Sequence, residues 1–179
     1  MRIIGGTFGG RRLPGRVAPG TRPTGDRVRE ALFSILGPLD GARVLDLFAG
    51  TGALGIEALS RGAAHAVLVD RDRLAVRAIR ANLTALNLGT ERAQVRPGEA
   101  GRALQDAAAR QEAYDLVFLD PPYEPASGLQ ALLAERLPPV LAPGARVVAE
   151  RGRRSPPPID LPLLTERRYG DTLLTIHQA

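Results

Sequence analysis

The stretch with the clearest chemical potential is DPPY at residues 120–123. Four consecutive apolar residues at 116–119 predict a buried strand that ends at Asp120. The two prolines fix two backbone φ angles and remove two amide donors, so the carbonyl of Pro121 is held stiffly beside the carboxylate of Asp120. Both oxygens can accept hydrogen bonds from an amino group, and Tyr123 can stack on a flat ring. The stretch predicts a site that orients the amino group of a base, although the same residues could simply form a strand exit followed by a turn.

A second stretch, DLFAGTGALG at 46–55, carries three glycines in the order G-x-G-x-x-G. They are Gly50, Gly52 and Gly55, and Asp70 lies 20 residues after Gly50. This spacing is typical of dinucleotide-binding turns. It indicates a nicotinamide oxidoreductase, in which Asp70 binds ribose hydroxyls, or an S-adenosylmethionine enzyme, in which the loop backbone approaches the cofactor. A tight strand-to-helix turn without a ligand needs small residues too.

Acidic residues follow four successive predicted strands, at Asp46, Asp70, Glu99 and Asp120. The carboxyl ends of parallel strands meet at one edge of the sheet, so these four residues (the acidic rim) favour a cationic or hydroxyl-rich ligand. S-adenosylmethionine would use all four, whereas a nicotinamide cofactor would use one. Asp46 would hold the loop or the cofactor's ammonium group, Asp70 the ribose hydroxyls, and Glu99 the adenine amine. The expected cofactor contacts are Asp46, Phe48, Gly50, Thr51, Gly52, Gly55, Asp70 and Glu99.

The elements that must position these residues alternate along the chain. Apolar runs predict strands at 43–47, 66–70, 93–96, 115–119 and 145–149, with helices near 52–61, 73–87, 100–110 and 127–136. The end of the chain predicts two further strands around 169–171. This order predicts an α/β fold, an open and mainly parallel sheet with helices on both faces.

The net charge of +5 is confined to the first fifth of the chain. Residues 1–36 hold seven arginines against two acids, and residues 37–179 hold 17 of each. A high-GC genome would explain arginine in place of lysine but not this segregation, which predicts a nucleic-acid partner. In this basic part we expect a hairpin at 2–13 and a helix that has Thr24 as its N-cap and ends at 37–38. The expected RNA contacts are Arg2, Arg11, Arg12, Arg22 and Arg27.

Composition excludes several other classes of protein. There is no cysteine and there are two histidines, so disulfides, thiolate catalysis and a metal site are not expected. No apolar run reaches the roughly 18–20 residues of a membrane span, and no signal peptide is apparent. A cytoplasmic protein without a membrane partner is expected.

The stretches RIIGG, RPTGDRVREALF, LDLFAGTGALGIEALSRGA and FLDPPY, in this order, resemble the bacterial 16S rRNA (guanine-N2)-methyltransferases of the small-subunit rRNA methyltransferase D family. The resemblance covers nearly the whole chain. It implies a class I S-adenosylmethionine-dependent methyltransferase fold, with a mainly parallel seven-stranded sheet and an antiparallel C-terminal strand. It further implies catalysis at Asp120, Pro121, Pro122 and Tyr123, and methyl transfer to the N2 amine of a specific guanine. The expected partner is 16S rRNA, free or within an assembling small subunit, and a monomer is expected.

On this interpretation residues 1–36 are a basic extension that docks RNA, and residues 37–179 are the catalytic domain. The target base would have to be flipped out or unpaired. Guanine is favoured because its N1–H and N2–H are adjacent donors that the carboxylate of Asp120 can accept together, whereas adenine presents a donor beside an acceptor. An adenine-N6 methyltransferase, a protein glutamine methyltransferase and a non-catalytic RNA-binding module stay open as alternatives.

Overall fold

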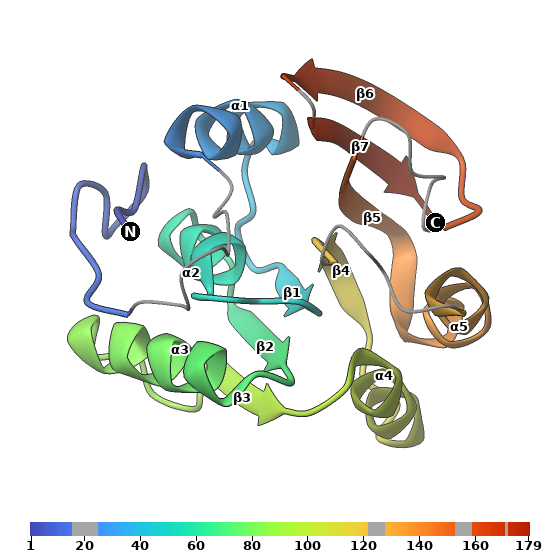
Figure 1. Ribbon diagram of the computed structural model, residues 1–179, viewed down its shortest axis with the longest axis horizontal. Coiled ribbons are helices and arrows are strands. Elements are labelled where there is room, and N and C mark those ends of the chain that lie inside the picture. The colour runs from blue at the N-terminus through green and yellow to red at the C-terminus, as the bar shows by residue number, and fades with distance from the viewer. Residues whose placement is uncertain (16–24, 122–127, 153–158, 171) are drawn as a thin grey trace.

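The computed structural model describes residues 1–15, 25–121, 128–152, 159–170 and 172–179. Its centre is a seven-stranded sheet with the strand order β3-β2-β1-β4-β5-β7-β6 (Figure 1). The strands are β1 (Arg43–Asp46), β2 (His65–Asp70), β3 (Ala93–Pro97), β4 (Tyr114–Leu119), β5 (Leu141–Gly152), β6 (Leu163–Tyr169) and β7 (Thr172–Gln178). The helices are α1 (Asp26–Leu36), α2 (Ala53–Ser60), α3 (Arg73–Ala85), α4 (Ala100–Ala109), α5 (Leu129–Arg136) and the short 3₁₀ helix η1 (Pro138–Val140).

The sheet is parallel from β3 to β5, and β7 runs antiparallel to both β5 and β6. Strand β1 lies between β2 and β4, with Val44 opposite Ala66 on one side and Leu116 on the other. The central strands are continuously apolar because helices cover both faces of the sheet. The predicted α/β fold with an antiparallel C-terminal strand is confirmed.

Two hydrophobic clusters lie on opposite faces of the sheet. On one face, Leu116 and Phe118 of β4 pack with residues of α1, α2 and α3. On the other face, Val117 and Leu119 pack with residues of α4 and α5. The period-two alternation along β4 therefore divides a continuous apolar run between two cores, and Figure 1 shows the helices on the two sides.

Some element ends differ from the expectations. The helix expected near 73–87 ends at Ala85, because the chain then turns through Asn87 in the left-handed region, with φ 54°. The strand expected at 145–149 extends over Leu141–Gly152, since both of its edges are paired. The prediction of Thr24 as an N-cap is wrong: α1 begins after Gly25, whose backbone carbonyl accepts from Arg29. Residue 24 lies outside the described part of the chain.

The expected hairpin at 2–13 is a doubled-back segment with one isolated β-bridge, between Arg2 and Arg12. The amide of Ile3 donates to the carbonyl of Arg11 (3.0 Å), and the amide of Leu13 donates to the carbonyl of Met1 (2.9 Å). Ile3 and Leu13 belong to the same hydrophobic cluster as α1, α2 and α3. This N-terminal segment, residues 1–15, therefore folds onto the helical face instead of standing alone.

Candidate active site

The glycine loop, residues 48–52, leads from β1 into α2 at the carboxyl edge of the sheet. Gly50 and Gly52 have φ of 55° and 80°, in the left-handed region that favours glycine. Asp70 Oδ2 accepts from the amide of Gly50 (2.8 Å), and Asp46 Oδ2 accepts from the amide of Gly55 (3.0 Å). Two acids of the expected rim therefore hold the loop at Gly50 and the first turn of α2 at Gly55.

Asp46 is only 1% exposed, so of its two expected roles the structure shows loop support. Its Oδ1 atom is buried and has no hydrogen-bond partner. Burial, and to a lesser degree the charge of Asp70, raises the pKa of Asp46 to about 7, although the hydrogen bond from the Gly55 amide and the nearby Phe48 amide lower it. This carboxyl would be stabilised in its charged form by a cationic group close to the loop.

Asp70 and Glu99 lie at the ends of the next two strands. Besides Gly50, the Asp70 carboxylate accepts from the amide of Asp72 (2.9 Å), and Asp72 in turn is the N-cap of α3, accepting from the amide of Leu74 (2.9 Å). Each carboxylate oxygen can accept more than one hydrogen bond, so Asp70 keeps capacity for hydroxyl groups. Glu99 is the N-cap residue of α4, but its side chain is 68% exposed and faces Arg71 at 3.5 Å.

Asp120 comes directly after β4, next to the glycine loop. The pairing of β1 with β4 places Asp46 opposite Phe118, and the amide of Leu47 continues the ladder by donating to the carbonyl of Phe118 (3.2 Å). Asp120 and Pro121 are both half-buried. The structure thus brings the start of DPPY beside the loop, while Pro122 and Tyr123 lie outside the described residues.

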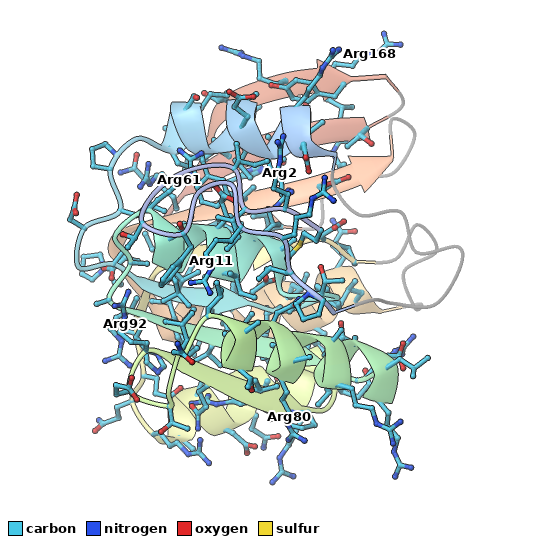
Figure 2. The ribbon with its side chains drawn as sticks, turned by 90° about the vertical axis from the view of Figure 1, so that its left-hand side faces the viewer. Arg2, Arg11, Arg61, Arg80, Arg92 and Arg168 are labelled. Atoms are coloured by element: carbon cyan, nitrogen blue, oxygen red, sulfur yellow. The ribbon has the colours of Figure 1, made fainter. Side chains whose placement is uncertain are left out.

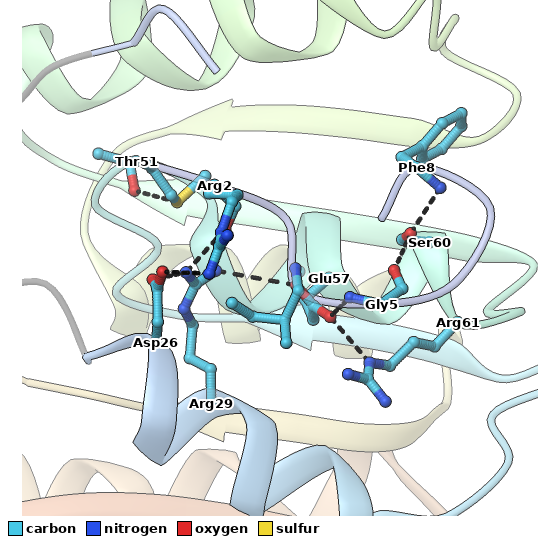
Figure 3. Close-up of polar contacts among 12 residues, drawn as sticks. Arg2, Gly5, Phe8, Asp26, Arg29, Thr51, Glu57, Ser60 and Arg61 are labelled. Carbon is cyan, nitrogen blue, oxygen red and sulfur yellow. Dashed lines mark hydrogen bonds and ion pairs between the residues drawn. The ribbon is translucent and has the colours of Figure 1, made fainter. Parts of the chain in front are cut away.

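Thr51, in the middle of the glycine loop, has contacts that the sequence did not reveal. Its hydroxyl donates to the sulfur of Met1 (3.2 Å), a contact visible in Figure 3. Its carbonyl accepts from Asn82 Nδ2 (2.9 Å), while Asn82 Oδ1 accepts from the amide of Gly15 (2.7 Å). Asn82 is fully buried and interrupts the apolar stripe of α3, and that interruption is the signal that could have identified it.

Glu57 was also missed, although an acid within the apolar run ALGIEALS is unusual. It is fully buried, and its two oxygens accept from the amides of Ile4 (2.8 Å) and Gly5 (2.9 Å). Arg61 Nε donates to it at 2.8 Å, and Arg29 lies 3.8 Å away (Figure 3). The carboxylate therefore anchors the start of the N-terminal segment to α2.

The arginines expected to contact RNA differ in their surroundings. Arg2 is 58% exposed and faces Asp26 at 3.5 Å, and Arg11 is exposed and donates to the carbonyl of Ala85 (2.7 Å). Arg12 and Arg27 are exposed, and Arg22 lies outside the described residues. Arg29, which contributes to the basic count, is buried. Its guanidinium bonds Asp26 at 2.6 Å, so its charge is used inside the fold.

Within the described ranges, no group of three or more His, Asp or Glu side chains could hold a metal ion. No helix in that part of the chain is both long and apolar enough to cross a membrane.

The chain is similar to known proteins over nearly its whole length. The family model described as Conserved hypothetical protein 95 matches residues 1–178. The Bacillus subtilis (strain 168) protein YlbH, named as a candidate rRNA methyltransferase, is 42% identical over 184 residues, or 99% of this chain and 98% of that protein. Ribosomal RNA small subunit methyltransferase D of Haemophilus influenzae is 36% identical over 183 residues, or 99% and 93%. The solved structure of the Escherichia coli protein yhhF, a candidate methyltransferase, is 38% identical with a TM-score of 0.81, covering 99% and 97%.

Proposed function

The chain belongs to the Conserved hypothetical protein 95 family, that of the small-subunit rRNA methyltransferases D, and from that premise we propose that it transfers a methyl group from S-adenosylmethionine to small-subunit rRNA. The finer target that we propose is the N2 amine of guanine 966 in 16S rRNA. The protein would act in the cytoplasm as a monomer, on rRNA that is free or part of an assembling subunit.

One observation carries the proposal: the glycine loop, tied down by Asp46 and Asp70, lies beside the residue that begins DPPY. A site for the cofactor and a site for the acceptor amine would then meet at the end of β1 and β4. A nicotinamide enzyme would need the loop and Asp70 but not Asp120.

The donor set fits S-adenosylmethionine. The bound cofactor supplies a methyl group on a sulfonium, which needs no acid to activate it. Asp70 would accept from the ribose hydroxyls, and the partly exposed backbone of Gly50 would lie against the cofactor. The buried Asp46 would stabilise positive charge through the loop, since its Oδ1 atom has no other partner. For Glu99 we propose contact with the adenine amine, which requires it to leave Arg71.

The acceptor amine would be oriented by Asp120 and by the carbonyl of Pro121. An exocyclic amine is a weak nucleophile because its lone pair is delocalised into the ring, and two fixed acceptors bias the nitrogen toward tetrahedral geometry. The methyl group would move to this nitrogen as the C–S bond breaks and the N–C bond forms, and Asp120 or water would take the proton of the resulting ammonium. Catalysis is then mostly orientation and electrostatic preorganisation. Tyr123 would stack on the base, with Pro122 stiffening the turn.

The experiment is single-turnover methyl transfer to small-subunit rRNA by the Asp120→Asn variant. We expect the rate to fall about 10²–10³-fold, the order lost when one preorganised partner of the reacting group is removed. Affinity for S-adenosylmethionine should be unchanged, because Asp120 would face the acceptor. The matched control is Asp115→Asn, the same change at the opposite end of β4, where the exposed carboxylate accepts from the amide of Arg43 (2.8 Å). A full rate in Asp120→Asn would remove this residue from the mechanism.

A further inference from the structure

Helix α3 carries three exposed arginines at positions i, i+4 and i+7: Arg73, Arg77 and Arg80. This spacing places them on one side of the helix, and we call them the arginine stripe. The opposite side of α3 is buried, where Ile79 and Asn82 pack. The helix sequence, RLAVRAIRANLTA, contains no acid. Residues 37–179 carry equal numbers of arginines and acids, but α3 within them has a local excess of positive charge.

The charges of the stripe are not used inside the protein. Within the described residues, no hydrogen bond or ion pair involves the side chains of Arg73, Arg77 or Arg80. Arg102 of α4, the next helix along the chain, differs because its side chain forms an ion pair with Asp106 at 2.9 Å.

Helix stability does not explain the stripe either. Like charges four residues apart destabilise a helix by about 0.2–0.5 kcal/mol. Arg73 also lies in the first turn, where the helix dipole disfavours a positive charge. Arginines that the fold neither neutralises nor needs point to a partner outside the chain.

The stripe begins at the acidic rim. Asp70 and the N-cap Asp72 immediately precede Arg73, and at the other end Arg11 donates to the carbonyl of Ala85. A helix rises about 1.5 Å per residue, so Arg73 and Arg80 are about 10 Å apart along the axis. Figure 2 looks onto this side of the molecule: Arg80 points outward from α3, and Arg11 lies on the other flank of the helix, by the N-terminal segment.

We propose that the arginine stripe binds the phosphate backbone of the rRNA where it leaves the acidic rim. The inference deepens the proposed function and rests on it. Guanidinium groups suit phosphate because they donate two parallel hydrogen bonds, and a row of them along a helix matches a chain of regularly spaced anions. The RNA strand whose base enters the site must pass close to the start of α3, since Asp70 and Arg73 lie at the same end of the sheet. The RNA surface thus includes part of the chain beyond residue 36.

The test uses the full chain with all three stripe arginines changed to Gln, and a fluorescent fragment of small-subunit rRNA as the probe. Affinity is measured by anisotropy over a series of salt concentrations. Each lost phosphate contact removes about 0.7–0.9 from the slope of log affinity against log salt, so we expect the slope to fall by about 2–3. Affinity at moderate salt should fall by about 10- to 100-fold. Calorimetry should show the same affinity for S-adenosylmethionine as in the parent.

The matched control changes Arg102, Arg167 and Arg168 to Gln, three exposed arginines on α4 and β6, for the same loss of charge. It should keep the parent's salt slope. Equal weakening in both triple variants, or an unchanged slope in the stripe variant, would overturn the proposal. If the parent instead bound an acidic peptide and the stripe variant lost that binding while keeping its RNA affinity, the stripe would belong to a protein partner and the proposal would be overturned. A parent that binds the fragment but transfers no methyl group to it would instead contradict the proposed function and leave the binding result standing.

Discussion

Two features of Asp46 disfavour its charged form. Its carboxyl is almost completely buried, and it lies close to a second acid, Asp70. One of its oxygens supports the glycine loop through the amide of Gly55, and the other has no partner. Burying an unpaired charge is costly, so the proton is retained to a higher pH than in the unfolded chain. The residue thus lowers stability near neutral pH in a place where a cationic ligand would restore it.

The buried carboxyl of Asp46 therefore predicts that the stability of the fold depends on pH. The pKa of Asp46 rises from 3.8 to about 7 on folding, so its contribution favours the folded state below about pH 4 and is lost as the pH rises through 7. Asp46→Asn keeps an acceptor for Gly55 but has no proton to lose. Its free energy of unfolding, relative to the parent, should increase between pH 4 and 7, by up to about 4 kcal/mol.

Urea denaturation at a series of pH values measures this difference. Asp160→Asn, the same change at an exposed position, serves as the control and should follow the parent curve. A constant difference between Asp46→Asn and the parent across this range would contradict the assignment.

At the scale of elements, α3 links the N-terminal segment to the glycine loop. Asn82 uses one amide atom for Gly15 and the other for the carbonyl of Thr51, so displacing either partner must disturb the other. A Cβ on Gly15 would lie 2.5 Å from the carbonyl oxygen of Ala78 and 2.7 Å from the Asn82 amide. The backbone at Gly15 would therefore have to move away from α3.

We accordingly expect Gly15→Ala to weaken S-adenosylmethionine binding by at least about fivefold, the lower end of typical coupling between sites. Gly25→Ala is the matched control, because a Cβ there meets no atom within 4 Å and its φ of −58° suits any residue. Calorimetric titration of both variants checks the expectation. Equal affinities would show that the loop does not depend on the N-terminal segment.

Helix α2 makes a second link, through Glu57. Glu57→Ala would leave the amides of Ile4 and Gly5 and the charge of Arg29 without their buried partner. Breaking a buried ion pair in this way costs about 3–5 kcal/mol. The neighbouring Ile56→Val, also fully buried, should cost about 0.5–1.5 kcal/mol.

Chemical denaturation gives the two free energies of unfolding. Hydrogen exchange should show that the amides of Ile4 and Gly5 lose protection in Glu57→Ala and keep it in Ile56→Val. Retained protection in Glu57→Ala would show that the segment is held by its apolar contacts instead.

The sequence predicted these elements where the signal was local. Apolar runs located the strands of the parallel sheet, and the order of strands and helices identified the fold. The acids at 46, 70, 99 and 120 were placed on one rim because strand ends are visible in sequence. Asn82 and Glu57 were missed because their partners, Gly15 with Thr51 and Ile4 with Gly5, lie more than 30 residues away along the chain. Such contacts follow from tertiary packing and leave no periodic pattern.

In the whole molecule, neither the hydrophobic core nor the exposed positive charge is divided at residue 36. The division into a basic extension at 1–36 and a catalytic domain at 37–179 stays a proposal about function, since Ile3, Leu13 and the apolar side of α1 share one hydrophobic cluster with the sheet. Conversely, the basic surface extends past residue 36 onto α3. Binding of rRNA and binding of the cofactor are therefore expected to depend on one folded unit.

The most direct test of the account is methyl transfer from isotopically labelled S-adenosylmethionine to small-subunit rRNA, followed by mass analysis of the nucleosides. We expect labelled N2-methylguanosine with the parent protein, little or none with Asp120→Asn, and the parent amount with Asp115→Asn. Labelled N6-methyladenosine would contradict the guanine assignment and leave a methyltransferase. Absence of any labelled nucleoside, from a protein that binds both S-adenosylmethionine and the RNA, would contradict the central claim that this rim joins the two substrates for transfer.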